Sequence, residues 1–169
     1  MMERVSTPEP HRTDTTAGLA PVADDLTRLA ASLGVKSVLV MRSEPGEMVV
    51  AATAGEATQH YTVGAAGKKA GDDESRVPLY CERVVDSDES LFVRDSRDDE
   101  ILAGNEDEKE FGLHNYLGLA VHDPDGKVVG TVCVLDDRAR DYTDAERAEL
   151  NRLRDDVERI VADGNSALG

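Results

Sequence analysis

The sequence predicts an α/β (α+β) fold in which a central antiparallel sheet is covered on one face by the first and the last helix. Three observations predict this fold: two apolar runs at 114–122 and 127–135 that are joined by a short turn, an amphipathic stretch at 21–33, and a capped helix that begins after Thr143. The two runs are apolar at almost every position, so we expect them to lie in the middle of the sheet with both faces covered.

The turn between the two runs has the sequence DPDG, at residues 123–126. Proline presets φ at the first central turn position, aspartate suits the next, and glycine accepts the left-handed conformation that leads back into the strand. Gly118 and Gly130 lie inside the runs, where a glycine often marks the close approach of another backbone or of a ligand. This segment is therefore predicted to be the central hairpin.

The N-terminal part is divided into a tail and a helix. Residues 1–18 are rich in Thr, Pro and Glu and show no apolar periodicity, so we predict a disordered tail, then one domain over 19–164 and a C-terminal tail over 165–169. The first helix is expected over 21–33, because Pro21 suits its first turn and Gly34 can end it.

The middle of the chain is predicted to alternate short elements with loops. Strands are expected over 35–42 and 47–53. The Gly-rich segment 54–73 is long for a loop of a compact domain, and such loops are usually functional or disordered. Further along we expect a short helix ending near residue 85, a strand at 91–93, and a charged loop at 96–110 that is anchored by Ile101 and Leu102.

The last helix begins with a capping box in the sequence TDAE, at residues 143–146, and is expected to continue to about residue 163. Its apolar residues are three and four positions apart, as in a coiled coil: Leu150, Leu153, Val157 and Ile160. We expect this helix to pack beside the first one on the sheet. We also expect its apolar stripe to contact a second copy of the chain or an effector, and thus to form a homodimer or an effector interface.

The chain has 35 acidic and 19 basic residues, a formal net charge of −16, and its acidic residues are spread along the sequence. This distribution resembles that of proteins from salt-loving cells, in which molar salt shortens the screening length to about 3 Å. We therefore expect the melting temperature to rise in molar KCl, and a melting temperature indifferent to salt would contradict this expectation. No basic stripe is present to neutralise phosphates, so direct binding to nucleic acid is disfavoured.

The composition also bears on location and on metal binding. No run of about 20 apolar residues is present, and the N-terminus lacks the apolar core of a signal peptide, so we expect a cytoplasmic protein without membrane contacts. Cys81 and Cys133 lie in apolar segments without a CxxC motif; we expect two buried reduced thiols, with a disulfide or a metal pair as the alternative. The four histidines form no ligand pattern, so no metal site is predicted.

The segment 111–136 carries a resemblance to a known family. Its residues FGLxxYLGLxxxxxDGxxxGTVCVLD resemble the C-terminal half of GAF domains, and the preceding PLYCERVVDSDESLFVRDSRDDE resembles the middle segment of that family. The resemblance is best over residues 77–161, with Ala120 where proline is usual. It implies a GAF-like fold with short helices and loops over a pocket, on the sheet face opposite to the terminal helices. It does not indicate one ligand, because GAF domains bind very different molecules.

The strand at 114–122 offers two faces, one of which borders the implied pocket. We assign Leu117, Leu119 and Val121 to the face under the helices, and the alternate residues from Tyr116 to His122 to the pocket. The ligand-binding residues that we predict are Arg76, Tyr80, Asp95, Phe111, His114, Tyr116 and Gly118. For each the alternative is a structural role, in the core for the aromatic residues and in a turn for Asp95.

The resemblance leaves the cofactor unknown. His60, in the Gly-rich loop, could approach a haem as in some GAF sensors, but a solvent-exposed histidine is favoured. Neither cysteine has the neighbours typical of bilin attachment, and the signature of the cyclic-nucleotide-binding members does not occur in order.

The function that we predict is a sensory or signal-transduction module without enzymatic activity. It would bind an unknown small molecule and transmit this binding through the last helix. One alternative is an enzyme similar to the free methionine-R-sulfoxide reductases, which needs a nucleophilic and a resolving cysteine. Against it, the loop after Cys81 has no cysteine, and Cys133 matches a family cysteine that is generally structural. The other alternative is a ligand-free interaction or dimerisation domain.

Overall fold

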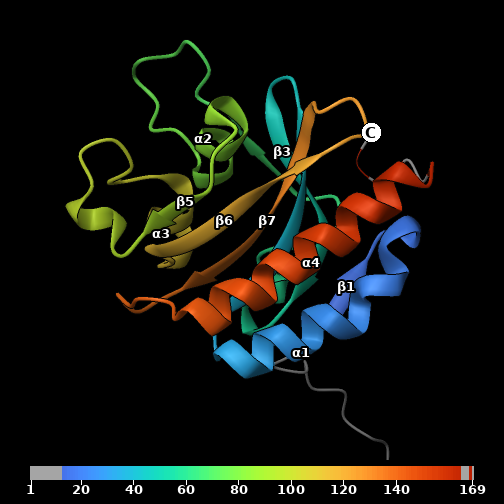
Figure 1. Ribbon diagram of the computed structural model, residues 1–169. Helices are drawn as coiled ribbons and strands as arrows, with labels where there is room; N and C mark the ends of the chain where they lie inside the picture. Colours follow the sequence, from blue (N-terminus) through green and yellow to red (C-terminus); the bar gives the residue numbers. More distant parts are fainter. Residues whose placement is uncertain (1–12, 165–167, 169) are drawn as a thin grey trace, which may run out of the picture.

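The computed structural model describes residues 13–164 and residue 168, which form one seven-stranded antiparallel sheet with helices on both faces (Figure 1). The strand order is β1-β3-β2-β7-β6-β5, and β4 also pairs with β3. The strands are β1 (Thr13–Thr15), β2 (Ser37–Glu44), β3 (Glu47–Ala54), β4 (Ala66–Lys68), β5 (Leu91–Val93), β6 (Asn115–His122) and β7 (Val128–Asp136). The helices are α1 (Ala23–Leu33), α2 (Tyr80–Ser87), α3 (Glu106–Phe111) and α4 (Asp144–Ala162), with 3-10 turns η1 (Ala17–Val22), η2 (Glu56–Gln59) and η3 (Ser96–Asp98).

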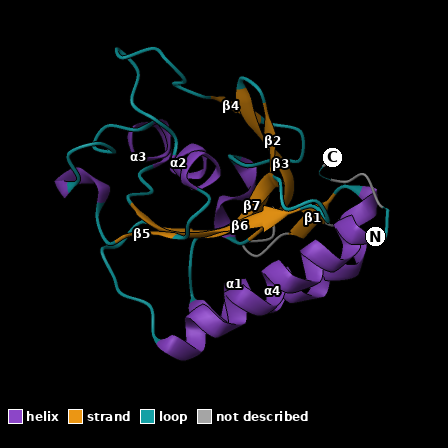
Figure 2. Cartoon of the chain, turned by 45° about the horizontal axis from the view of Figure 1, so that its top comes forward, coloured by secondary structure: helices purple, strands orange, loops and turns teal. Residues whose placement is uncertain are grey.

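The sheet separates two layers, as Figure 2 shows. The helices α1 and α4 lie side by side on one face, where aliphatic residues such as Leu117, Leu119 and Val121 form the core beneath them. The helices α2 and α3 and the long loops cover the other face, where Tyr116 and Ala120 lie in a second core. The predicted fold class is therefore confirmed, and the predicted assignment of the two strand faces is confirmed from Tyr116 to Val121.

The hairpin β6–β7 is central, as predicted, because β7 pairs with β2 on its other side and β6 pairs with β5. Its turn closes as the sequence indicates: the Asp123 carboxylate accepts from the backbone N–H of Asp125 and Lys127, and Gly126 has φ of 86°. At Gly130 the backbone of β2 comes close, since a Cβ at this position would collide with the Met41 carbonyl. The register of β2 shifts beside this carbonyl, so the glycine accommodates a β-bulge.

The helix α4 begins with the predicted capping box, in which Thr143 Oγ1 accepts from the N–H of Glu146 and Glu146 Oε1 accepts from the N–H of Thr143. Its apolar stripe, however, does not face outward. Leu150, Leu153 and Val157 are all at most 3 % exposed and pack against the sheet of their own domain. Our expectation that this stripe is presented to a partner is corrected by this packing, because the core already covers it.

Three further predictions are revised by the structure. Thr13–Thr15, placed in the predicted tail, pairs with β3, whereas residues 1–12 of that tail lie outside the described residues. The segment 54–73 contains η2 and β4 and is held to α2, because the buried Glu82 carboxylate accepts from the N–H of Ala70 and Gly71. Of the two predicted anchors, Leu102 is buried but Ile101 is 52 % exposed.

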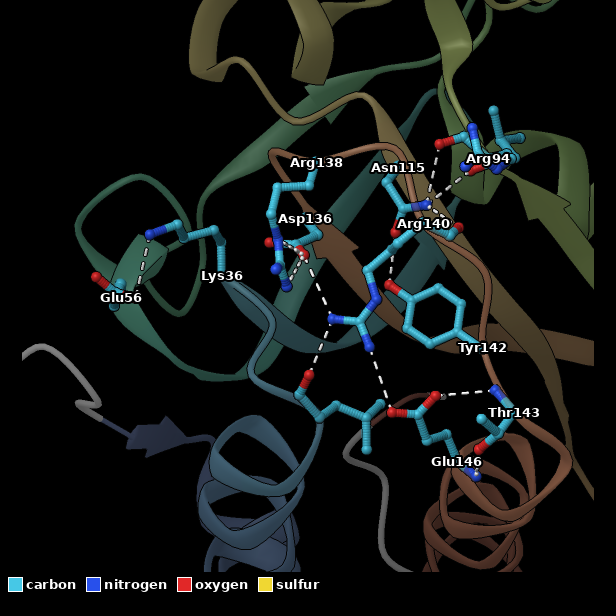
Figure 3. Close-up of polar contacts among 12 residues, drawn as sticks. Lys36, Glu56, Arg94, Asn115, Asp136, Arg138, Arg140, Tyr142, Thr143 and Glu146 are labelled. Carbon is cyan, nitrogen blue, oxygen red and sulfur yellow. Dashed lines mark hydrogen bonds and ion pairs between the residues drawn. The ribbon is translucent and has the colours of Figure 1, made fainter.

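A polar network ties the helical layer to one end of the sheet (Figure 3). The Asp136 carboxylate, 1 % exposed at the end of β7, accepts hydrogen bonds from Arg138 and Arg140. Arg140 also donates to the carbonyl of Leu33 at the end of α1 and to Glu146 at the start of α4. The network thus joins β7 to both helices, and Tyr142 extends it by donating to Asn115 Oδ1 of β6 at 2.5 Å.

None of the helices in the described part of the chain combines the length and the hydropathy that a bilayer crossing requires.

Candidate functional site

A cavity of about 80 Å³ lies on the sheet face that α2 and α3 cover. Its sheet side is formed by apolar side chains of the central strands: Leu39, Met41, Met48, Val50 and Leu135. The other side consists of residues from η2 onward, among them Tyr61, Cys81, Asp107 and Phe111. Since one water needs about 10–15 Å³ of such volume, the cavity can hold a few waters or one small chemical group.

Asp107 places a half-buried carboxyl group in the lining of this largely apolar cavity, which also includes Glu106 and His60. Its Oδ1 accepts a 2.6 Å hydrogen bond from the Tyr61 hydroxyl, and within the described residues no Lys, Arg or His nitrogen lies within 4.0 Å of it. Burial, reinforced by the nearby Glu106 and Glu110, raises the pKa of Asp107 to about 6, although the hydrogen bond from Tyr61 acts in the opposite direction. The carboxyl group therefore changes its charge close to neutral pH.

Aromatic rings line the cavity together with Asp107. The His60 ring stacks on Phe111 with centroids 4.6 Å apart, and Tyr61 meets the same ring edge-on at 5.2 Å. The local reason is helical spacing, because Asp107 and Phe111 are four residues apart and so lie on one side of α3.

A second, more polar cleft of about 440 Å³ adjoins the cavity, with which it shares Leu79 and Glu106. Three basic residues line it, namely Lys68, Arg76 and Lys109, and none of them makes an ion pair within 4.0 Å among the residues that are described. The acidic residues Asp73, Glu106 and Glu110 line the same cleft. It therefore offers both charges to a molecule that extends out of the inner cavity.

Tyr116 forms the floor of the cavity, and its position depends on Gly118. The Tyr116 ring stacks on Tyr80, with centroids 4.6 Å apart, and lies along the strand so that a Cβ at position 118 would collide with it. The glycine that we predicted near a ligand is therefore covered by the ring of Tyr116. Burial raises the pKa of Tyr116 well above its usual range, so its hydroxyl stays protonated.

The structure separates the seven predicted site residues into three groups. Phe111 and Tyr116 line the cavity, and Arg76 lines the adjoining cleft. Tyr80 and Gly118 lie behind Tyr116 in the core. Asp95 accepts from the N–H of Arg97 in a turn and lies 3.5 Å from Nδ1 of His114, and this pair borders neither the cavity nor the cleft. Ligand contact remains a prediction for Phe111, Tyr116 and Arg76.

His122 also lies elsewhere than expected. The register of β6 shifts between Val121 and His122, so its ring leaves the pocket face. Nδ1 lies 2.8 Å from Glu158 of α4, and Nε2 lies 2.6 Å from Asp88, which ends α2. The residue thus connects the two helical layers at the end of the strand.

Asp107 and Tyr61 were not among the predicted site residues, because both lie in segments that we interpreted as a charged loop and a Gly-rich loop. The four-residue spacing between Asp107 and Phe111 could have indicated the first, since Phe111 was already a candidate. Within the described residues, no three His, Cys, Asp or Glu side chains come together as metal ligands would.

The profile of the GAF domain matches residues 22–160 of this chain, which is most of its length. The chain belongs to the GAF domain family. This family has a fold that is typical of sensor and signalling modules. The sheet, the two terminal helices and the cavity described above agree with that fold. A search of curated proteins finds no significant match to this sequence.

Solved structures of very different proteins share this GAF fold. The GAF domain of a phosphoenolpyruvate-protein phosphotransferase from Acinetobacter superposes with a TM-score of 0.64 at 14% identity, covering 87% of this chain and 83% of that one. A free methionine-R-sulfoxide reductase from Neisseria meningitidis, solved with its substrate, gives 0.64 at 14% identity, covering 88% and 80%. A far-red cyanobacteriochrome photoreceptor gives 0.61 at 11% identity, covering 85% and 87%. At such identities the likeness shows the fold alone.

Proposed function

We propose that this GAF domain is a sensory module that binds a small molecule carrying a cationic or hydrogen-bond-donating group. The group would enter the inner cavity and face Asp107, while the rest of the molecule would extend into the cleft lined by Lys68, Arg76 and Lys109. One observation carries the proposal: Asp107 is a carboxyl group in an apolar cavity with no basic partner in the described structure. Asp107 is half-buried, and its raised pKa shows that the charged form is disfavoured where it lies. A cationic ligand can supply the missing match to this charge.

The route from the cavity to the helical layer supports a signalling role. The strands β6 and β7 border the second core with one face and pack against α4 with the other. Two residues of α4 bond directly to β6: Arg154 donates to the carbonyl of Ala120 and Glu158 accepts from the N–H of His122. A ligand that favours one arrangement of these strands would therefore bias the position of α4.

We place the readout on the exposed side of α4, where Arg152, Asp155 and Arg159 face solvent. A second copy of the chain or an effector would contact this charged side, because the apolar side packs on the sheet. Sedimentation of the full chain and of an Arg152→Glu, Arg159→Glu double variant tests the homodimer: dissociation of a dimer in the variant supports it. A wild-type monomer at all concentrations contradicts the homodimer and leaves the effector as the partner.

The ligand proposal is tested by thermal unfolding with simple probes. At pH 7.5 and constant ionic strength, n-butylammonium is expected to raise the melting temperature, and n-butanol is not, because only the ammonium group pairs with the Asp107 carboxylate. The shift should disappear in Asp107→Asn and should decrease as the pH falls below about 6, where Asp107 is protonated.

A matched control separates this effect from the general attraction of cations to an acidic protein. Asp155→Asn removes one exposed carboxylate from α4, far from the cavity, and should leave the n-butylammonium shift intact. Equal shifts in Asp107→Asn and in the wild type would contradict the proposal.

A second candidate function is the reduction of free methionine-R-sulfoxide. The observation that favours it is a thiol pair, in which Cys81 lines the cavity and Cys133 lies behind it. This candidate requires turnover of free methionine-R-sulfoxide with NADPH and a thioredoxin system, abolished in Cys81→Ser. If the wild-type chain shows no turnover, this second candidate is excluded and the sensory function is the one that we retain.

A further inference from the structure

We propose that Cys81 and Cys133 form a redox-reactive pair in which a small peroxide oxidises Cys81 from the cavity and Cys133 closes an intramolecular disulfide. This inference goes beyond the sensory function and depends on neither the amine ligand nor methionine sulfoxide turnover. It rests on the geometry of the two sulfurs and of the cavity beside them.

The two thiols are 52 residues apart in sequence and come together through packing of α2 on β7. Their sulfurs are 3.8 Å apart, and both cysteines are free. A disulfide bond is about 2.05 Å long, so the sulfurs need to approach by less than 2 Å, a distance that small side-chain rotations and a slight shift of α2 can supply.

The two cysteines have different access to the cavity. Cys81 lines it and is 8 % exposed, whereas Cys133 is fully buried in the centre of the sheet beneath it. The cavity of about 80 Å³ has room for hydrogen peroxide, which is only slightly larger than water, and is too small for bulky oxidants. The positions therefore assign the first reaction to Cys81 and the second to Cys133.

The neighbours of Cys81 favour its reactive form. The Thr131 hydroxyl donates to its sulfur at 3.2 Å, the Tyr116 hydroxyl lies 3.3 Å from it, and Cys133 contributes an S–H. These hydrogen bonds, that of Cys133 first, lower the pKa of the Cys81 thiol, whereas burial raises the pKa of Cys133 well above its usual range. A thiolate is the nucleophile in such reactions, so both the geometry and the charge point to Cys81 as the attacking sulfur.

The chemistry balances with one peroxide. The Cys81 thiolate attacks one peroxide oxygen, the S–O bond forms as the O–O bond breaks, and the leaving hydroxide takes up the proton that Cys81 released, giving water and a sulfenic acid. Cys133 then attacks the Cys81 sulfur, the S–S bond forms as the S–O bond breaks, and the leaving hydroxide takes the Cys133 proton as a second water. Sulfur loses two electrons in total and peroxide gains them, and an external dithiol restores both thiols.

The test uses the full reduced chain, treated with hydrogen peroxide under native conditions, unfolded, alkylated and mapped by mass spectrometry. We expect a peptide pair cross-linked through Cys81 and Cys133, a mass loss of two hydrogen atoms, and full reversal by dithiothreitol. Two free alkylated cysteines after treatment, disulfides only between chains, or a disulfide that forms only in urea would each overturn the proposal.

Variants assign the order of reaction. In Cys133→Ser, or in Cys133→Ala if the serine variant does not fold, dimedone should label a persistent sulfenic acid at Cys81. In Cys81→Ser, Cys133 should stay reduced at the same peroxide dose. A Cys81 that proceeds to sulfinic acid in the wild-type chain while Cys133 stays free would refute the resolving role.

The contribution of Tyr116 gives a graded readout. Tyr116→Phe removes one hydrogen bond to the thiolate and should slow the oxidation of Cys81 by about tenfold, the change expected for a hydrogen bond to a charged group. Tyr80→Phe is the matched control, because its ring belongs to the same stack but its hydroxyl donates to the Leu113 carbonyl instead. Equal rates in the two variants would contradict the assignment of Cys81 as the activated sulfur.

Discussion

Asp136 is buried and Asp107 is half-buried, and the two carboxyl groups have opposite surroundings. Asp136 ends β7 within a network in which Arg138 and Arg140 match its charge (Figure 3). Asp107 faces a cavity in which it receives one hydrogen bond from Tyr61 and, among the residues that the structure describes, has no Lys, Arg or His nitrogen within 4.0 Å. The Oδ2 atom of the first carboxylate accepts the hydrogen bonds from both arginines and helps to hold α1, α4 and the sheet together. The second carboxylate has a charge that the proposed ligand would match. The supply of counterions therefore distinguishes the structural site at Asp136 from the candidate binding site at Asp107.

The largest effect is expected at the structural end. Asp136→Asn removes the buried carboxylate that accepts from Arg140, whose side chain is 17 % exposed, and from Arg138, whose side chain is 64 % exposed. Loss of these hydrogen bonds between charged groups should cost about 3 kcal/mol. Urea unfolding should show this loss. Asp155→Asn, an exposed carboxylate on α4, serves as control and should stay within about 0.5 kcal/mol of the wild type. If Asp136→Asn lowers the free energy of unfolding no more than this control does, Asp136 has no special structural role and its contrast with Asp107 is refuted.

At the cavity, replacing aspartate with asparagine should instead stabilise the folded protein. Asp107 has a folded pKa of about 6, and in an unfolded chain an aspartate titrates near 3.9, so between these values the folded protein binds more protons. Stability should therefore fall as the pH rises from about 4 to about 6. Asp107→Asn lacks this loss and should be more stable than the wild type at pH 7.5, by up to about 3 kcal/mol, and similar near pH 4.

The measurement is the free energy of unfolding of both proteins across this pH range. A difference between them that does not change with pH would show that the folded Asp107 is not destabilised by its charge.

The floor of the cavity provides the next test. Gly118→Ala should destabilise by about 2 kcal/mol, because the added methyl group displaces the packed ring of Tyr116. In a Tyr116→Ala background the same change should be nearly neutral, so a double-mutant cycle isolates the contact. If Gly118→Ala lowers the stability equally in the wild type and in Tyr116→Ala, the added methyl group does not collide with the Tyr116 ring.

The smallest effect is expected at His122, which connects the two layers. Hydrogen bonding to Glu158 first, and then to Asp88, raises the pKa of His122. A raised histidine pKa stabilises the fold below about pH 6.5, and this contribution is lost as the pH rises through the folded pKa. His122→Gln should therefore lower stability by less than about 1 kcal/mol at pH 6 and leave it unchanged at pH 9. Equal losses at both pH values would assign the effect to packing.

The elements governed by local rules could be predicted from the sequence. The DPDG turn, the TDAE capping box and the left-handed Gly34 each act within a few residues, and their elements formed as expected. The contacts of the site join residues far apart in the chain, such as Tyr61 with Asp107 and Cys81 with Cys133. The spacing of residues in the sequence does not predict such pairs, because they form only when α2 and α3 pack on the sheet.

Charged residues that turn inward were the second feature that the sequence did not predict. Asp107 lies in the sequence EDEKEF, and Glu82 in a similarly polar helix, and such sequences usually indicate exposed surface. In the folded domain the first turns toward a cavity, and the second supplies both oxygens to the N–H groups of the long loop. The hydrogen bonds that compensate for the lost hydration of these carboxylates come from residues that are near them only in the folded chain.

The strand β6 alternates in side-chain direction, and this has a mechanical consequence. Tyr116 and Leu117 are joined by one peptide bond, yet the first borders the cavity and the second packs in the core beneath α1 and α4. In the proposed sensor, the ligand site and the helical readout would therefore lie on the two faces of one strand, and a small rotation of β6 about its own axis would move the side chains on both. The proposed signal would then have to cross only the thickness of the sheet.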